Sequence, residues 1–143
     1  MKKAVLVCIS LLLAGSAVVA QTDVIAERKG IMRGNGAATR TGTQMIRGEI
    51  PYDQAKAKEV FEGIAAGMNR FPNLFPENSK TGGETKASPR IWEDMPGFRA
   101  AAAKIVADAQ AASAATTDQA SFQANFQRVT GNCQSCHQAY RQS

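Results

Sequence analysis

The sequence FQANFQRVTGNCQSCHQAY, residues 122–140, contains an amphipathic helical pattern close to the C-terminal end of the chain. Its apolar, cysteine and histidine positions recur at intervals of three and four residues, which is the spacing of one face of an α-helix. That face consists of Phe122, Phe126, Val129, Cys133, Cys136, His137 and Tyr140. Because a helix buries such a stripe against other elements, the pattern predicts a terminal helix whose inward face includes two thiols and an imidazole.

The motif Cys133-x-x-Cys136-His137 within this helix is the attachment pattern of a c-type haem. The two thiols add to the haem vinyl groups, and the adjacent imidazole becomes an axial ligand of the iron. A redox dithiol or half of a zinc site would also use two cysteines at this spacing. The chain has neither a βαβ pattern nor a second Cys pair, and it contains one histidine. We therefore expect one covalent haem c per chain.

The N-terminus has the pattern of a cleaved secretory signal peptide. Lys2 and Lys3 precede an apolar run at 4–13, and small residues follow at 18–20. The run is shorter than a membrane-spanning helix requires, so we expect no membrane span. Cleavage after residue 20 leaves one domain, residues 21–143, in the periplasm. It also lowers the formal net charge from +5 to +3, and no basic cluster indicates binding to nucleic acid.

The remaining sequence predicts an all-α protein. Helices are expected at about 23–47, 52–70, 98–115 and from 117 to the end, with a short helix through Ile91 and Trp92 and an interruption at 95–97. Residues 71–88 are irregular, and their apolar side chains indicate that the first half packs against the core. Because the other connections are short, we predict an antiparallel up-down-up-down four-helix bundle with the haem at one end.

The residue opposite His137 on the iron is the open question. The chain has no second histidine, so a methionine thioether is the natural sixth ligand. Met45 is too far along the first helix, and Met68 is at the end of the second. Met32 and Met95 both lie within roughly 15 Å of the haem end at the α-helical rise. The spacing does not choose between Met32, Met95 and an empty sixth position.

Three features together resemble the class II c-type cytochromes, the cytochrome c prime family. They are the pattern Cys133-x-x-Cys136-His137-x-x-Tyr140-Arg141, the sequence Pro89-x-Ile91-Trp92 and the Phe-Pro pairs after the second helix. The resemblance extends over nearly the whole mature chain. It implies a left-handed four-helix bundle, often dimeric, with thioether bonds from Cys133 and Cys136 and with His137 as the proximal ligand.

This family has two branches. Five-coordinate members bind nitric oxide or carbon monoxide, whereas low-spin members use a methionine of the first helix as the sixth ligand. Residues 31–36 and 48–55 resemble the low-spin branch, which implies Met32 as the second iron ligand. Arg28, one turn earlier, is then a candidate partner of a haem propionate.

We therefore expect an electron carrier that exchanges electrons with redox partner proteins, and a five-coordinate gas-binding protein is the alternative. An enzyme is not expected, because no second histidine is available as a distal acid or base. Ile31, Gly34, Ala38 and Met45 form a second seam on the first helix. This seam predicts a weak homodimer.

Overall fold

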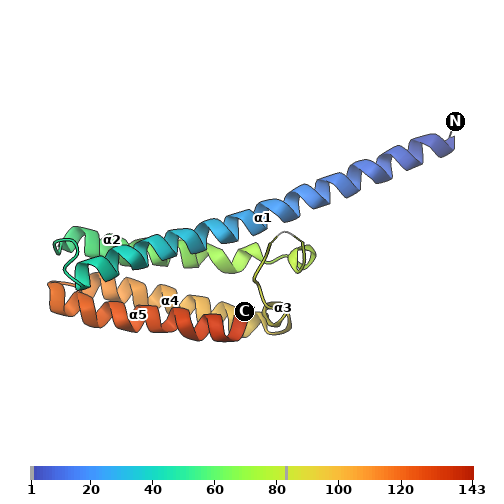
Figure 1. Ribbon diagram of the computed structural model, residues 1–143. Helices are drawn as coiled ribbons and strands as arrows, with labels where there is room; N and C mark the ends of the chain where they lie inside the picture. The colour runs from blue at the N-terminus through green and yellow to red at the C-terminus, as the bar shows by residue number, and fades with distance from the viewer. Residues whose placement is uncertain (1, 83) are drawn as a thin grey trace.

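The computed structural model describes residues 24–82 and 84–143 with their side chains, so the predicted signal peptide lies outside the fully described part of the chain. The helices are α1 (Lys2–Ile46), α2 (Gln54–Arg70), α3 (Arg90–Glu93), α4 (Met95–Ala115) and α5 (Gln119–Tyr140), with 3₁₀ turns at Phe71–Leu74 and Glu77–Ser79. Figure 1 shows the α1–α2 hairpin above the α4–α5 hairpin, with α1 and α5 running in opposite directions. The prediction of an all-α antiparallel four-helix bundle is confirmed.

Aspartates at the helix starts define two of the predicted boundaries. Asp53 precedes α2 and accepts a hydrogen bond from the Lys56 amide at 2.8 Å. Asp118 precedes α5 and forms a reciprocal capping box with Ser121. Such caps satisfy amide groups that the first helical turn leaves without partners.

The predicted interruption between the short helix and the next one is present, but its predicted position at 95–97 is wrong, because α3 ends at Glu93 and α4 already begins at Met95. The carboxylate of Asp94 caps this helix by accepting a hydrogen bond from the Gly97 amide at 3.0 Å. Pro96 lies in the first turn, where its missing N–H would have had no helical acceptor. The proline therefore begins the helix instead of breaking it.

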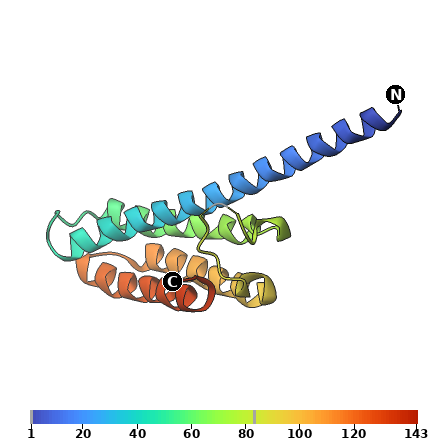
Figure 2. The ribbon, with the colours of Figure 1, turned by 45° about the vertical axis from the view of Figure 1, so that its right-hand side comes forward.

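The predicted extension of the last helix to the end of the chain is also wrong. α5 ends at Tyr140, and the tail turns back onto the segment before α3. The Ser88 amide donates to the Tyr140 carbonyl at 3.0 Å, and the Gln142 amide donates to the Lys86 carbonyl at 2.9 Å. In Figures 1 and 2 the connection from α2 to α3 passes close to the C-terminus. We call this end of the bundle, with residues 71–94 and 141–143, the haem end.

The opposite end, with the connections at 47–53 and 116–118, is called the turn end. Its core is aromatic: the Phe122 ring lies 5.4 Å from the Phe61 ring and 6.1 Å from the Tyr52 ring, between centroids. α1 packs closely on α5 at Gly42, where an added Cβ would clash with the Phe126 ring. Glycine at this position therefore allows α1 and α5 to pack directly.

The seam predicted for a dimer is largely an internal packing face. Met45 is fully buried and Ile31 is 7% exposed, and both belong to the core of the protomer. Ile31 faces α2, because a Cβ added at Gly67 would lie 3.2 Å from its Cγ2. The assignment of Ile31 and Met45 to a surface seam was wrong, since the helical period alone does not say which neighbour covers a face. Within the described residues, none of the helices has the length and apolar character needed to cross a membrane.

Candidate haem-attachment site

The inward face of α5 is buried near the start of the helix but becomes partly exposed at the Cys133–His137 motif. Phe122 and Val129 are fully buried, whereas Cys133 and Cys136 are partly exposed and His137 is exposed. All of these residues belong to one face of α5, and the part of that face nearer the turn end is packed into the bundle. The bundle interior therefore opens over the two thiols and the imidazole, which is where a bulky group attached to them would lie.

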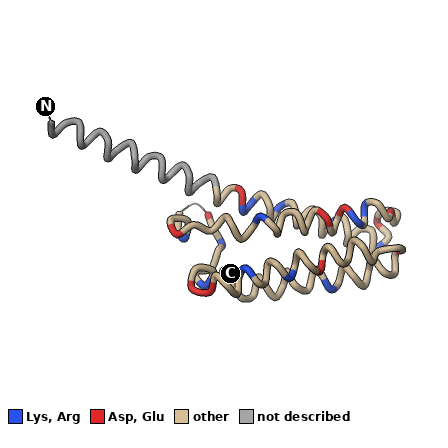
Figure 3. Tube along the Cα trace, turned by 180° about the vertical axis from the view of Figure 1, so that it is seen from behind, with Lys and Arg blue, Asp and Glu red and all other residues tan. Residues whose placement is uncertain are grey.

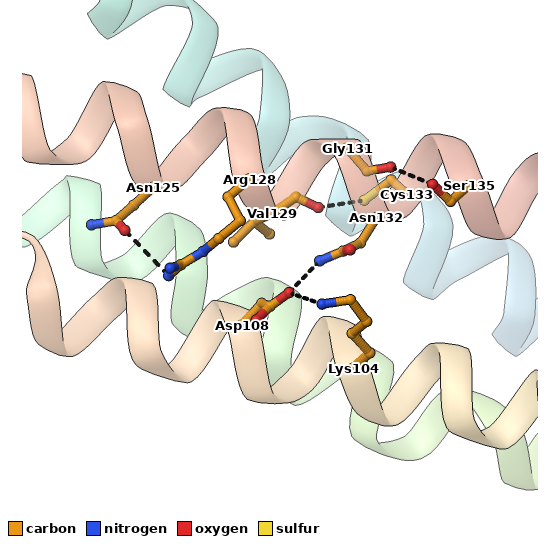
Figure 4. Close-up of polar contacts among 9 residues, drawn as sticks. All are labelled: Lys104, Asp108, Asn125, Arg128, Val129, Gly131, Asn132, Cys133 and Ser135. Carbon is orange, nitrogen blue, oxygen red and sulfur yellow. Dashed lines mark hydrogen bonds and ion pairs between the residues drawn. The ribbon is translucent and has the colours of Figure 1, made fainter.

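Neither thiol has a partner that would remove it from this chemistry. Cys133 and Cys136 are free, and the Cys133 thiol contacts the Val129 carbonyl of its own helix at 3.7 Å (Figure 4). Burial raises the pKa of both thiols, so both are protonated at neutral pH. The pair is thus available for bond formation with a vinyl group.

The imidazole of His137 is in the form that an iron ligand requires. Partial desolvation, and then the nearby charge of Arg141, lower its pKa below the ordinary value of 6.5. The ring is therefore neutral at pH 7, with a lone pair on one nitrogen. Among the described residues, none forms a hydrogen bond with this ring, so both ring nitrogens are free of protein partners.

The contact of Gly42 with Phe126 determines which part of α1 faces the motif. Met32 lies ten residues before Gly42, and Cys136 lies ten residues after Phe126. Since the two helices are antiparallel, both residues are about 15 Å along their helices from this contact. Met32 is partly buried and packs against the core. The register therefore brings Met32 to the level of Cys136 and His137.

The facing part of α1 also loses burial. Arg28 and Gly42 are buried, but Met32, Asn35 and Thr39 between them are only partly buried. The facing sides of α1 and α5 are thus both partly exposed to solvent at the same distance along the bundle axis. No group of three His, Cys, Asp or Glu side chains within the described residues converges as in a metal cage. His137 and Met32 could supply only two donor atoms to an iron ion here, and the nitrogens of a porphyrin would supply the others. The residues fit a covalently attached haem.

The three other described methionines, Met45, Met68 and Met95, differ from Met32 in position. Met45 and Met68 are buried in the core. Met95 follows Asp94, whose carboxylate accepts a hydrogen bond from the Tyr140 hydroxyl at 2.9 Å. This bond brings Met95 to the level of Tyr140, about one helical turn beyond His137.

Arg28, the predicted propionate partner, is 4% exposed, and each of its guanidinium nitrogens has a partner in the segment after α2. Nε donates to the Leu74 carbonyl at 2.6 Å, Nη1 donates to the Ser79 carbonyl at 3.2 Å, and Nη2 donates to the Ser79 hydroxyl. Burial lowers the pKa of Arg28 to about 10, so the group stays charged at neutral pH. A contact with a propionate stays a prediction.

Sequence reasoning missed a polar cluster beside Cys133. The Asp108 carboxylate of α4 accepts hydrogen bonds from Lys104 at 2.8 Å and from Asn132 at 2.7 Å (Figure 4). Asn132 precedes Cys133, so this bond holds the first attachment residue against α4. The Lys104–Asp108 spacing is visible as an i,i+4 pair, whereas the contact with Asn132 depends on how the helices pack.

The helix that holds the motif has few charges. Between Gln119 and Tyr140, Arg128 is the only Asp, Glu, Lys or Arg. Figure 3 shows more charged residues along the hairpin that includes α2 than along the hairpin that includes α5. The charges that lie nearest the motif are therefore those of Arg141, which follows α5, and of the Lys104–Asp108 pair on α4.

Comparison with known proteins gives one consistent result. The sequence profile described as Cytochrome C' matches residues 23–141. A cytochrome c' from Rhodopseudomonas palustris is 47% identical over 123 residues, which cover 86% of this chain and 84% of that protein. A cytochrome c-556 from Agrobacterium fabrum is 36% identical over 118 residues, covering 82% of this chain and 80% of that protein. The structure of Rhodopseudomonas palustris cytochrome c' has a TM-score of 0.82 and 45% identity, covering 85% of this chain and 97% of that chain.

Proposed function

Because the chain belongs to the cytochrome c′ family, we propose that it is a periplasmic electron carrier in which Cys133 and Cys136 hold the haem and His137 and Met32 ligate the iron. Proteins of this family contain covalently bound haem c, whose iron supplies one-electron redox chemistry. The protein transfers electrons between redox partner proteins and turns over no substrate.

The chain's own side chains have separate tasks in this proposal. The two thiols would tether the macrocycle to α5, and the neutral imidazole of His137 would ligate the iron. Met32 would approach the iron from α1 and exclude other ligands from it. The observation that supports Met32 is the register of α1 against α5, which follows from the packing of Gly42 on Phe126.

Substitution of the two candidate methionines tests the ligand assignment. We expect a low-spin visible spectrum in the oxidised and reduced protein, and a high-spin spectrum in Met32→Ala. Met95→Ala is the matched control and should leave the spectrum unchanged. A change in Met95→Ala together with no change in Met32→Ala would show that the assignment is wrong.

A second candidate function is a five-coordinate protein that binds nitric oxide or carbon monoxide. The 47% identity to a protein named cytochrome c' favours it. In this case Met32 would pack beside the haem without ligating iron. Prompt carbon monoxide binding by the untreated ferrous protein, together with a high-spin spectrum, would favour this function over electron transfer.

We also propose that the protein is exported and forms a weak homodimer through α1. A groove of about 340 Å³ lies between α1 and α2. It is lined by Gly30, Ile31, Gly34, Asn35, Gly63, Ala66, Gly67 and Arg70. Small side chains allow close helix approach, which supports a second copy at this face. Sedimentation that detects only monomer at high concentration would contradict the dimer, and a purified protein that retains residues 1–20 would contradict export.

A further inference from the structure

The segment from Phe71 to Asp94 contacts both helices that face the haem site. On the α1 side, its partner is Arg28. The guanidinium binds Leu74 and Ser79, and it lies 3.9 Å from the centroid of the Phe75 ring. A buried arginine needs such partners, because a charged group without hydrogen bonds is strongly unfavourable away from water.

The same segment is joined to α5. The Trp92 indole donates to the Phe75 carbonyl at 3.0 Å, which links α3 to the part that binds Arg28. Asp94, which follows α3, accepts the hydrogen bond from the Tyr140 hydroxyl at 2.9 Å. The Phe98 ring stacks edge-on against Phe75 at 4.8 Å and Tyr140 at 5.3 Å, between centroids. An unbroken series of contacts therefore connects Arg28 with Tyr140.

The two ends of this series are adjacent to the proposed iron ligands. Arg28 lies four residues before Met32, one turn along α1, and Tyr140 lies three residues after His137 on α5. In this part of the bundle the two helices do not pack as they do at Gly42, because Met32, Cys133 and Cys136 are only partly buried. The separation of Met32 and His137 must then depend on contacts other than direct packing of α1 on α5.

We propose that Arg28 is a positioning residue, which holds the Met32 turn of α1 at a set distance from the His137 turn of α5 by binding Leu74 and Ser79. This inference rests on the proposed ligation of iron by Met32. The arginine itself need not touch the haem. Its planar fork binds the two acceptor residues at once, which a lysine ammonium does not reproduce.

Two substitutions separate this role from a contact between Arg28 and a propionate. Arg28→Lys keeps the positive charge on α1 but loses the fork. Ser79→Ala removes an acceptor of Arg28 and leaves the arginine in place. We expect both haem-loaded variants to contain more high-spin iron and to bind carbon monoxide roughly tenfold faster, the scale on which outer partners of metal ligands act. Arg40→Lys, an exposed position on α1, should match the wild type.

Guanidinium unfolding of the same proteins separates positioning from simple loss of stability. A merely structural role would lower the unfolding midpoint and leave the spectrum of the folded protein unchanged, and that result would overturn the inference. A wild-type spectrum and rate in Arg28→Lys, with a change only in Arg28→Ala, would indicate that the charge matters and would also overturn it.

Met32→Ala distinguishes the failure of this inference from the failure of the proposed function. If Met32→Ala becomes high-spin while Arg28→Lys and Ser79→Ala match the wild type, the ligand assignment holds and the positioning role is wrong. If Met32→Ala leaves the spectrum unchanged, the ligand assignment fails and the positioning role fails with it.

Discussion

The turn end and the haem end of this bundle are stabilised in different ways. At the turn end, Phe61 and Phe122 are fully buried, and Gly42 lets α1 rest directly on α5. At the haem end the same inward stripes are incompletely covered at Met32 and at Cys133. Hydrogen bonds from Arg28 and between Tyr140 and Asp94, together with the ring contacts of Phe98 with Phe75 and Tyr140, connect the helices there through the segment 71–94.

This difference indicates that the turn end mainly stabilises the fold, whereas the haem end accommodates the cofactor. Close packing at the turn end stabilises the fold directly, because apolar burial is the dominant favourable term in folding. The haem end has to leave room for a large planar group, so its geometry depends on the polar and aromatic contacts around the opening. Removal of a buried ring at the turn end should therefore change stability alone, whereas substitutions around the opening, or at the Gly42 contact that sets the register of α1, should also change the spectrum.

The largest expected effect is that of Phe122→Ala at the turn end. Removal of this buried ring should lower the free energy of unfolding by about 3–5 kcal/mol, as large-to-small changes in cores do. The visible spectrum of the folded haem protein should stay unchanged, since Phe122 lies about three turns before Cys133. Guanidinium unfolding followed by circular dichroism measures the loss. A change of spin state in the folded variant would break the separation of the two ends.

Gly42→Ala tests the contact that sets the register of α1. The new methyl group would overlap the Phe126 ring, and overpacking of this kind costs about 1–3 kcal/mol. Because α1 would be displaced from α5, we also expect more high-spin iron in this variant. Gly63→Ala on α2 is the control, since its added Cβ meets nothing within 4 Å and alanine is the better helix former. Equal stability of the two variants would contradict the close contact.

A smaller and pH-dependent effect is expected for Asp108→Asn beside the motif. Hydrogen bonds from Lys104 and Asn132 lower the pKa of Asp108 below its ordinary value of 3.8. A lowered carboxyl pKa stabilises the fold above the ordinary value, and this contribution is lost as the pH falls through the lowered value. The variant should be less stable than the wild type at pH 7, and the difference should disappear on acidification. Urea unfolding at several pH values measures it; a difference that persists in acid would exclude the charge as its cause.

The smallest effect is expected for Tyr52→Phe. The Tyr52 hydroxyl is buried, and the described residues provide no hydrogen-bond partner for it. Its removal should leave the free energy of unfolding unchanged or raise it by up to about 1 kcal/mol. Tyr140→Phe is the counterpart at the haem end and should destabilise the protein, because its hydroxyl donates to Asp94. Thermal unfolding compares the two variants, and a clear loss in Tyr52→Phe would show that this hydroxyl has a partner.

Local sequence patterns predicted much of this molecule. The stripe from Phe122 to Tyr140, the boundaries of α2 and the packing of Phe71 and Phe75 all follow from helical spacing, proline positions and burial of apolar side chains. The patterns failed where two local rules compete. Pro96 can end one helix or begin the next, and the Asp94 cap decided for the latter.

What the sequence determined by itself is the attachment chemistry and the helices, because both depend on residues close together in the chain. Cys133, Cys136 and His137 all lie within two turns of one helix. Only the tertiary structure decided that Met45 is internal, that Arg28 binds residues 74 and 79, and that Met32 lies level with the motif. Those features depend on which helices touch and in what register, and helical periodicity does not specify the neighbour that each face meets.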